Sequence, residues 1–127
     1  MEQGTQFRVL SPDGGGLIPS DRVQGTEVFR SGGEHIGHID RLMIDKETGR
    51  VAYAVLAFGG FLGVGERHCP VPWSLLRYSD ELGGYEINVA DEQLRGAPAI
   101  EPSEKSWTSR ERDQHIHEHF NVPGYWV

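Results

Sequence analysis

Residues 58–73 read FGGFLGVGERHCPVPW, and the structure of this glycine-rich stretch decides the fold of the whole chain. A phosphate-binding P-loop has the pattern G-x-x-x-x-G-K-[ST], in which the lysine contacts phosphate and the hydroxyl binds magnesium. Here Glu66 and Arg67 follow the last glycine, and the next segment has the composition of a strand. The stretch therefore predicts a wide hairpin between two buried strands, in which glycines permit positive φ.

Phe61 and Leu62, at the centre of this hairpin, have two alternative environments. They either fold over one mouth of a barrel and seal its core, or stand exposed. A large exposed apolar patch is unfavourable, which favours the inward arrangement. If they point outward, they are the best candidates for a protein contact, because apolar anchors dominate interface energies.

Short apolar segments separated by turn residues extend from this hairpin in both directions. The segment 51–58, VAYAVLAF, is apolar on both faces, which is typical of a strand buried on both sides. The sequence DKETG before it indicates a hairpin loop, in which Asp45 bonds to the backbone ahead and Gly49 adopts positive φ. The alternation of the preceding strand breaks at Gly37, where a bulge is expected. Strands are predicted at residues 23–29, 35–44, 51–58, 67–71, 73–78 (after a bend) and 85–89.

About six short strands at close spacing predict a mainly β protein, a small barrel or sandwich. The two ends of the chain lack this pattern. A helical turn is expected at 90–94, and a helix from about residue 103 to 121, with its N-cap at either Ser103 or Thr108. The chain is thus divided into a flexible N-terminal segment, a barrel domain and a helical extension with an aromatic tail: residues 1–21, 22–98 and 99–127.

The order of these elements resembles the PRC-barrel family between Val23 and Pro98. The resemblance rests on GEHIGHIDRLMIDKETGRVAYAVLAFGGFLGVGERHCPVPWSLLRY, then GGYEINV, then EQLRGAP. The most specific piece is GGFLGVGE followed by VPW. The terminal YWV also resembles the ending of short bacterial stand-alone members.

This resemblance implies a small six-stranded barrel with no catalytic constellation and no cofactor. Related domains occur in the reaction-centre H subunit, where they influence electron and proton transfer, and in the ribosome-maturation factor, where they help bind a ribosomal protein. The expected function is a non-catalytic protein-binding or scaffolding module that self-associates. Two alternatives stay open: a metal- or small-ligand-binding protein that uses the C-terminal histidines, and a ribosome- or RNA-associated factor that acts through a protein partner.

The amino-acid composition restricts the classes of partner that this chain can bind. The 127-residue chain carries 12 basic and 19 acidic side chains, a net charge of −7, and this charge repels both nucleic acid and anionic membrane surfaces. No apolar run approaches the ~20 residues that span a bilayer, and no signal peptide is evident. We therefore expect no direct nucleic-acid contact and no membrane insertion. The single cysteine fits a reducing compartment, and the cytoplasm is the expected location.

Three histidines alternate near the C-terminus. On a strand, all three would share a face and resemble a zinc or copper site. On the predicted helix, His115 and His119 share a face while His117 lies ~200° around from His115. His115 and His119 are therefore the metal candidates. The alternative is a solvated polar face opposite Ile116 and Phe120.

The nucleophiles and carboxylates are not arranged for catalysis. His68 and Cys69 are neighbours in a strand and point to opposite faces, so His68 does not activate the thiol, and a buried structural cysteine is favoured. Asp40 and Asp45 fall on opposite faces as well, which gives no carboxylate pair. The sequence predicts that the protein is not an enzyme.

The aromatic residues of the extension have a structural and a binding interpretation. Without a basic stripe beside them, a stacking platform for RNA is disfavoured. Packing of the helix onto the barrel is favoured, and its thin apolar stripe needs such a partner, in its own barrel or in a homodimer. The candidates for a protein interface are Phe61, Leu62, Trp107, Phe120, Tyr125 and Trp126.

Overall fold

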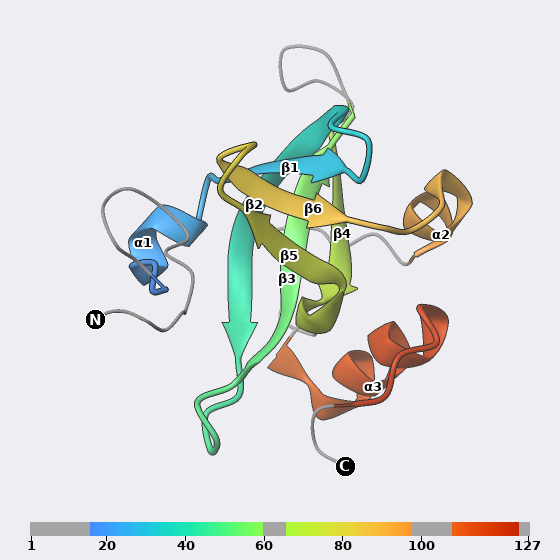
Figure 1. Cartoon of the computed structure of the whole chain (residues 1–127). Helices are drawn as coiled ribbons and strands as arrows, with labels where there is room; N and C mark the ends of the chain where they lie inside the picture. The colour runs from blue at the N-terminus through green and yellow to red at the C-terminus, as the bar shows by residue number, and fades with distance from the viewer. Residues whose placement is uncertain (1–15, 60–65, 98–107, 125–127) are drawn as a thin grey trace.

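The structure, a computed structural model, describes residues 16–59, 66–97 and 108–124, and its centre is one six-stranded sheet that curls into a half-barrel (Figure 1). The strands lie in the order β4-β3-β2-β1-β6-β5. The β1–β6 pair is parallel, and the other pairs are antiparallel. The mainly β, six-stranded prediction is confirmed. The strands are β1 Glu27–Arg30, β2 His35–Ile44, β3 Val51–Phe58, β4 Arg67–Pro72, β5 Leu76–Ser79 and β6 Gly84–Ile87.

Short helices complete the described part of the chain. A 3-10 helix, η1 (Trp73–Leu75), forms the bend between β4 and β5. The α-helices are α1 (Ser20–Val23), α2 (Asp91–Gly96) and α3 (Arg110–His119). Within the described residues, no helix combines the length and the apolar character that crossing a membrane requires.

The long β2–β3 hairpin follows the sequence closely. Both strands have the predicted bounds, and β3 is buried over nearly its whole length. The Asp45 side chain accepts hydrogen bonds from the backbone N–H groups of Glu47 (2.8 Å) and Thr48 (3.2 Å), and Gly49 has φ 79°. These bonds satisfy the donors at the start of the loop, so the predicted turn chemistry is confirmed.

The predicted irregularity beside Gly37 is also present. The register of β1 against β2 runs from Val28↔Gly37 to Phe29↔His35, so Ile36 is the extra residue of a bulge. Gly37 is required for a different reason, namely close approach. A Cβ at this position would lie 2.2 Å from the carbonyl oxygen of Ala57 on β3.

We expect Gly37→Ala to lower the free energy of unfolding by about 2 kcal/mol, because the added methyl group meets backbone, which has no rotamer to change. Equilibrium urea denaturation measures the difference. Gly32→Ala is the matched control, since a Cβ there meets no atom within 4 Å, and its effect should stay within about 0.5 kcal/mol. Equal effects of the two substitutions would refute the close-approach argument.

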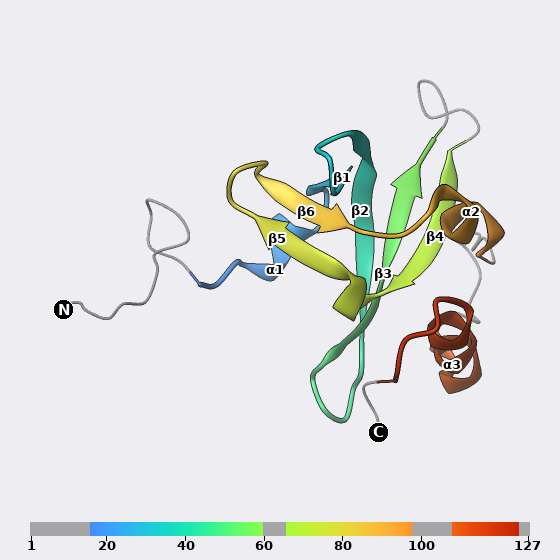
Figure 2. The ribbon, with the colours of Figure 1, turned by 45° about the vertical axis from the view of Figure 1, so that its right-hand side comes forward.

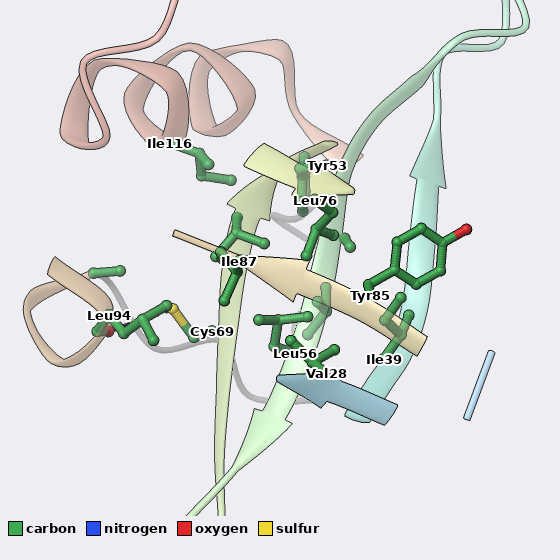
Figure 3. Packing of buried hydrophobic residues seen from close by; sticks show 14 of the residues in the cluster. Val28, Ile39, Tyr53, Leu56, Cys69, Leu76, Tyr85, Ile87, Leu94 and Ile116 are labelled. Atoms are coloured by element: carbon green, nitrogen blue, oxygen red, sulfur yellow. Dashed lines mark hydrogen bonds between the residues drawn. The ribbon is translucent and has the colours of Figure 1, made fainter. Parts of the chain in front are cut away.

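The core lies in the curl of the sheet and extends under the helices (Figure 3). Val28, Ile39, Leu56, Val71 and Ile87 are at most 1% exposed. Tyr85 and Ile87 point inward as the alternation of their strand predicts. A shift of a strand by one residue would turn these side chains away from the core, so the core fixes the strand register.

Two element boundaries differ most from the sequence prediction. The segment 23–29 is not one strand: α1 ends at Val23, Gly25 has φ 84°, and β1 begins only at Glu27. A left-handed glycine interrupts extended backbone, which explains the break. At the other end, α3 begins at Arg110 and its N-cap is Ser109, so the prediction of Thr108 as N-cap was wrong, and the alternative, Ser103, lies outside the described residues.

The two C-terminal helices lie side by side against the outer edge of β4 (Figure 2). Ile116 and Phe120 of α3 are 1% and 5% exposed and belong to the core cluster. The imidazole Nε2 of His119 lies 2.9 Å from the carbonyl oxygen of Gln93 and links α3 to α2. The helix of the extension was expected to pack either on its own barrel or on a second copy in a homodimer. The helix α3 covers a sheet edge of its own barrel.

Candidate functional site

A groove of about 510 Å³ lies between the β2–β3 hairpin and the first turn of α3, and we call it the hairpin groove. Apolar side chains from both strands line it: Met43, Ile44, Ala52 and Tyr53. Ala52 and Tyr53 are buried, whereas Ile44 is 54% exposed. A large apolar side chain that stays exposed beside a hollow is a feature of interaction sites.

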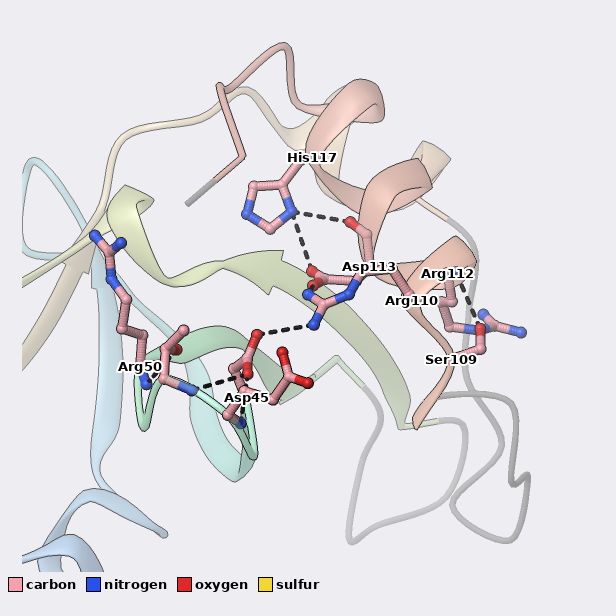
Figure 4. Close-up of polar contacts among 9 residues, drawn as sticks. Asp45, Arg50, Ser109, Arg110, Arg112, Asp113 and His117 are labelled. Carbon is pink, nitrogen blue, oxygen red and sulfur yellow. Dashed lines mark hydrogen bonds and ion pairs between the residues drawn. The ribbon is translucent and has the colours of Figure 1, made fainter. Parts of the chain in front are cut away.

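The opposite wall of the groove is polar, and its side chains hold α3 to the hairpin (Figure 4). The guanidinium of Arg110 donates through Nη2 to Asp45 Oδ2 (2.8 Å) and through Nη1 to Asp113 Oδ2 (3.2 Å). Both carboxylates are nearly buried, with side-chain exposures of 5% and 6%, whereas Arg110 is 49% exposed. Arg110 therefore bridges two segments that are 65 residues apart in the chain.

His117 extends this network into the interior. Its Nδ1 lies 2.9 Å from the backbone carbonyl oxygen of Asp113 and 3.3 Å from the carboxylate Oδ1 of the same residue. Both neighbours are acceptors, so Nδ1 carries a proton and donates. We call Asp45, Arg110, Asp113 and His117 the α3 latch. In the latch two carboxylates face one guanidinium and one imidazole.

Sequence reasoning missed the α3 latch. The histidine-rich helix was expected to present a solvated polar face, but His117 is 4% exposed and Asp113 is 5% exposed. The helical spacing itself carried the signal: Arg110 and Asp113 are three residues apart, and Asp113 and His117 are four apart. Pairs with these spacings lie side by side on a helix surface.

The proposed metal ligands occupy different environments on α3. His115 is exposed, whereas the ring of His119 contacts the Gln93 carbonyl. The helix directs His117 away from both, as the sequence predicts. Across residues 16–59, 66–97 and 108–124, no group of three or more histidine, cysteine, aspartate or glutamate side chains is placed to hold a metal ion. A metal site at His115 and His119 stays a prediction.

Most of the protein-interface candidates lie outside the residues that the structure describes. Phe120 is buried in the core of its own chain, so its ring is not presented at the surface. The other five candidates lie outside the described residues: Phe61, Leu62, Trp107, Tyr125 and Trp126.

Cys69 is a buried structural residue, as expected. Its side chain is 2% exposed, its Sγ donates to the Leu94 carbonyl oxygen at 3.4 Å, and burial raises its pKa to about 12.

We predict that iodoacetamide at pH 8 alkylates the native Cys69 thiol about a thousandfold more slowly than the urea-unfolded thiol. Only the thiolate reacts, and the fraction of thiolate in the native protein is smaller by about that factor. Mass spectrometry of timed samples measures both rates. Equal rates would contradict the buried, protonated thiol.

Comparison with known proteins identifies the barrel. The model of the PRC-barrel domain matches residues 16–94, which is more than half of the chain. The protein belongs to the PRC-barrel family. No curated protein gives a match. The PRC-barrel match ends within α2, so the β2–β3 hairpin is part of the family domain while α3 is not. The hairpin groove therefore joins a family element to an extension that the match does not cover.

Proposed function

We propose that this PRC-barrel protein is a non-catalytic module that binds an apolar segment of a partner protein in the hairpin groove. The observation that carries the proposal is the apolar lining of the groove beside a half-exposed Ile44. Burial of the exposed half of this side chain against a partner contributes roughly 1 kcal/mol. An extended or helical segment with one or two apolar anchors fits this arrangement.

The pairing of Arg110 in the polar wall supports an apolar partner rather than an anionic ligand of that guanidinium. The guanidinium of Arg110 is already engaged by Asp45 and Asp113, so binding of a phosphate or carboxylate group would compete with two internal ion pairs. The same pairing supports a non-catalytic role. A general base needs access to a substrate proton, whereas the carboxylates of Asp45 and Asp113 are nearly buried and bonded to neighbouring side chains and backbone groups.

The proposal is tested by selecting peptides from a random displayed library on the full chain and measuring their affinities by calorimetry. We expect the selected peptides to share an apolar position and to bind Ile44→Lys at least about tenfold more weakly. Ile44 is 54% exposed, so this variant should still fold. Ser31→Lys, in the exposed turn at the other end of β2, is the control of equal charge change and should bind normally. Selected peptides that bind Ile44→Lys as tightly as the wild type, or a selection that enriches none, would reject the hairpin groove.

A further inference from the structure

The chain turns back at the end of α3. Asn121 has φ 57°, the left-handed conformation in which many helices end. The N–H of Asn121 donates to the carbonyl oxygen of Glu118 (3.1 Å), and the N–H of Val122 donates to that of His117 (3.0 Å). Val122 also packs against the core cluster, so apolar contact holds the returning chain as well. Figures 1 and 2 show the chain beyond α3 running back in the direction of the β2–β3 hairpin.

Residues 125–127, Tyr-Trp-Val, lie directly beyond the described part of the chain, and we call them the YWV segment. The helix α3 sets the distance from this segment to the hairpin groove. Asp113 and Arg110, which line the groove, precede His117 by about 6 and 10 Å along the helix axis. Val122 is fixed beside His117, and the five residues after it span up to about 17 Å when extended. The YWV segment is therefore long enough to reach the groove.

The YWV segment also matches the groove in its chemistry. It carries no charged side chain, so its binding would leave the ion pairs of Arg110 intact. Aromatic rings pack against apolar side chains, and the thioether of Met43 in the groove lining is a favourable neighbour for a ring edge. A buried indole N–H needs an acceptor, and the polar wall has the carboxylate oxygens of Asp45 and Asp113. An aromatic segment of the same chain is thus an occupant that fits both walls.

We propose that the YWV segment occupies the hairpin groove of its own chain when no partner is bound, with Trp126 as its anchor, and that a partner segment displaces it. The displacement rests on the proposed function, whereas the occupancy does not. A segment tethered this closely has an effective concentration on the order of millimolar, so a contact with a lower dissociation constant keeps the groove filled for most of the time. A partner segment longer than these three residues covers more of the groove, which lets it compete.

Paramagnetic broadening tests the occupancy. A spin label at Lys46→Cys, exposed on the rim of the groove, should broaden the indole N–H resonance of Trp126, which the Trp126→Phe variant assigns by its absence. Ser31→Cys, exposed in the turn before β2, is the control: the ten residues of β2 separate it from the groove by about 30 Å, so its label should leave the resonance sharp. The native Cys69 is buried and stays unlabelled.

Two results would overturn the occupancy. One is a Trp126 resonance that stays sharp when the label is at position 46. The other is broadening of equal strength when the spin label is carried by a second, isotope-free copy, because the contact would then form between chains.

Competition tests the displacement. Trp126→Ser should bind a peptide selected on the full chain about fivefold more tightly than the wild type, because loss of the anchor raises the fraction of molecules with an open groove. Trp126→Phe keeps an aromatic ring and should stay within about twofold of the wild type. Unchanged or weaker binding by Trp126→Ser, with the circular dichroism of the wild type, overturns the displacement.

The two proposals fail separately. If the label at position 46 broadens the Trp126 resonance but no peptide binds, the occupancy stands and the proposed function fails. If a peptide binds in a manner that depends on Ile44 while the Trp126 resonance stays sharp, the proposed function stands and the occupancy fails.

Discussion

Replacing Asp113 by alanine is expected to lower the free energy of unfolding by about 3 kcal/mol, because it removes a buried charged acceptor and leaves its hydrogen-bond partners unsatisfied. Asp113 accepts from Arg110 at 3.2 Å and lies against His117 Nδ1 at 3.3 Å. The side chains of Asp113 and His117 are 6% and 5% exposed, so solvent replaces the lost carboxylate poorly. Arg110 is half-exposed, so solvent screens its ion pair with Asp113 in part.

Chemical denaturation with tryptophan fluorescence measures this loss. Glu111→Ala, exposed in the same first turn of α3, is the matched control and should change stability by no more than about 0.5 kcal/mol. Asp113→Asn should fall between the two, because the amide oxygen still accepts a hydrogen bond but carries no charge. A change below about 1 kcal/mol for Asp113→Ala would show that the latch does not hold α3 in place.

Ile116→Ala is expected to produce a loss of similar size, about 3 kcal/mol, by a different mechanism. Ile116 is 1% exposed and projects from α3 into the core cluster (Figure 3), so truncation leaves a cavity between the helix and the barrel. Gln114→Ala, on the exposed face of the same helix, controls for the change in helix propensity. If the two variants unfold at the same denaturant concentration, α3 does not contribute to the core as described.

Much of the barrel could be predicted because its local signals agree with the fold. The doubly apolar segment Val51–Phe58 and the loop chemistry of Asp45 and Gly49 gave β2, β3 and their turn with correct bounds. The β1 boundary was wrong because Gly25 fits a strand bulge and a turn equally well by residue type. The parallel β1–β6 pairing joins residues 57 apart, such as Val28 and Tyr85, and no local pattern encodes such a contact.

The site was harder to predict than the fold because its chemistry is tertiary. By residue type, Asp113 and His117 belong to a solvated helix face, and they are buried because α3 packs against the barrel. Asp45 was predicted to bond to the backbone of its own turn, and it does so. Its second carboxylate oxygen accepts from Arg110, which lies in a different part of the sequence. The family match covers only the hairpin half of the groove, so the family identity alone does not define the site.

Hydrogen exchange of the full chain, with and without a peptide selected on it, tests the central claim most directly, namely that the hairpin groove is the binding surface. We expect the bound peptide to slow amide exchange in two segments far apart in the sequence, residues 43–53 and 108–113, which line the groove. Exchange in β5, which does not line the groove, should not change with the peptide. Protection confined to β5 or to α2, with the groove segments unaffected, would contradict the account.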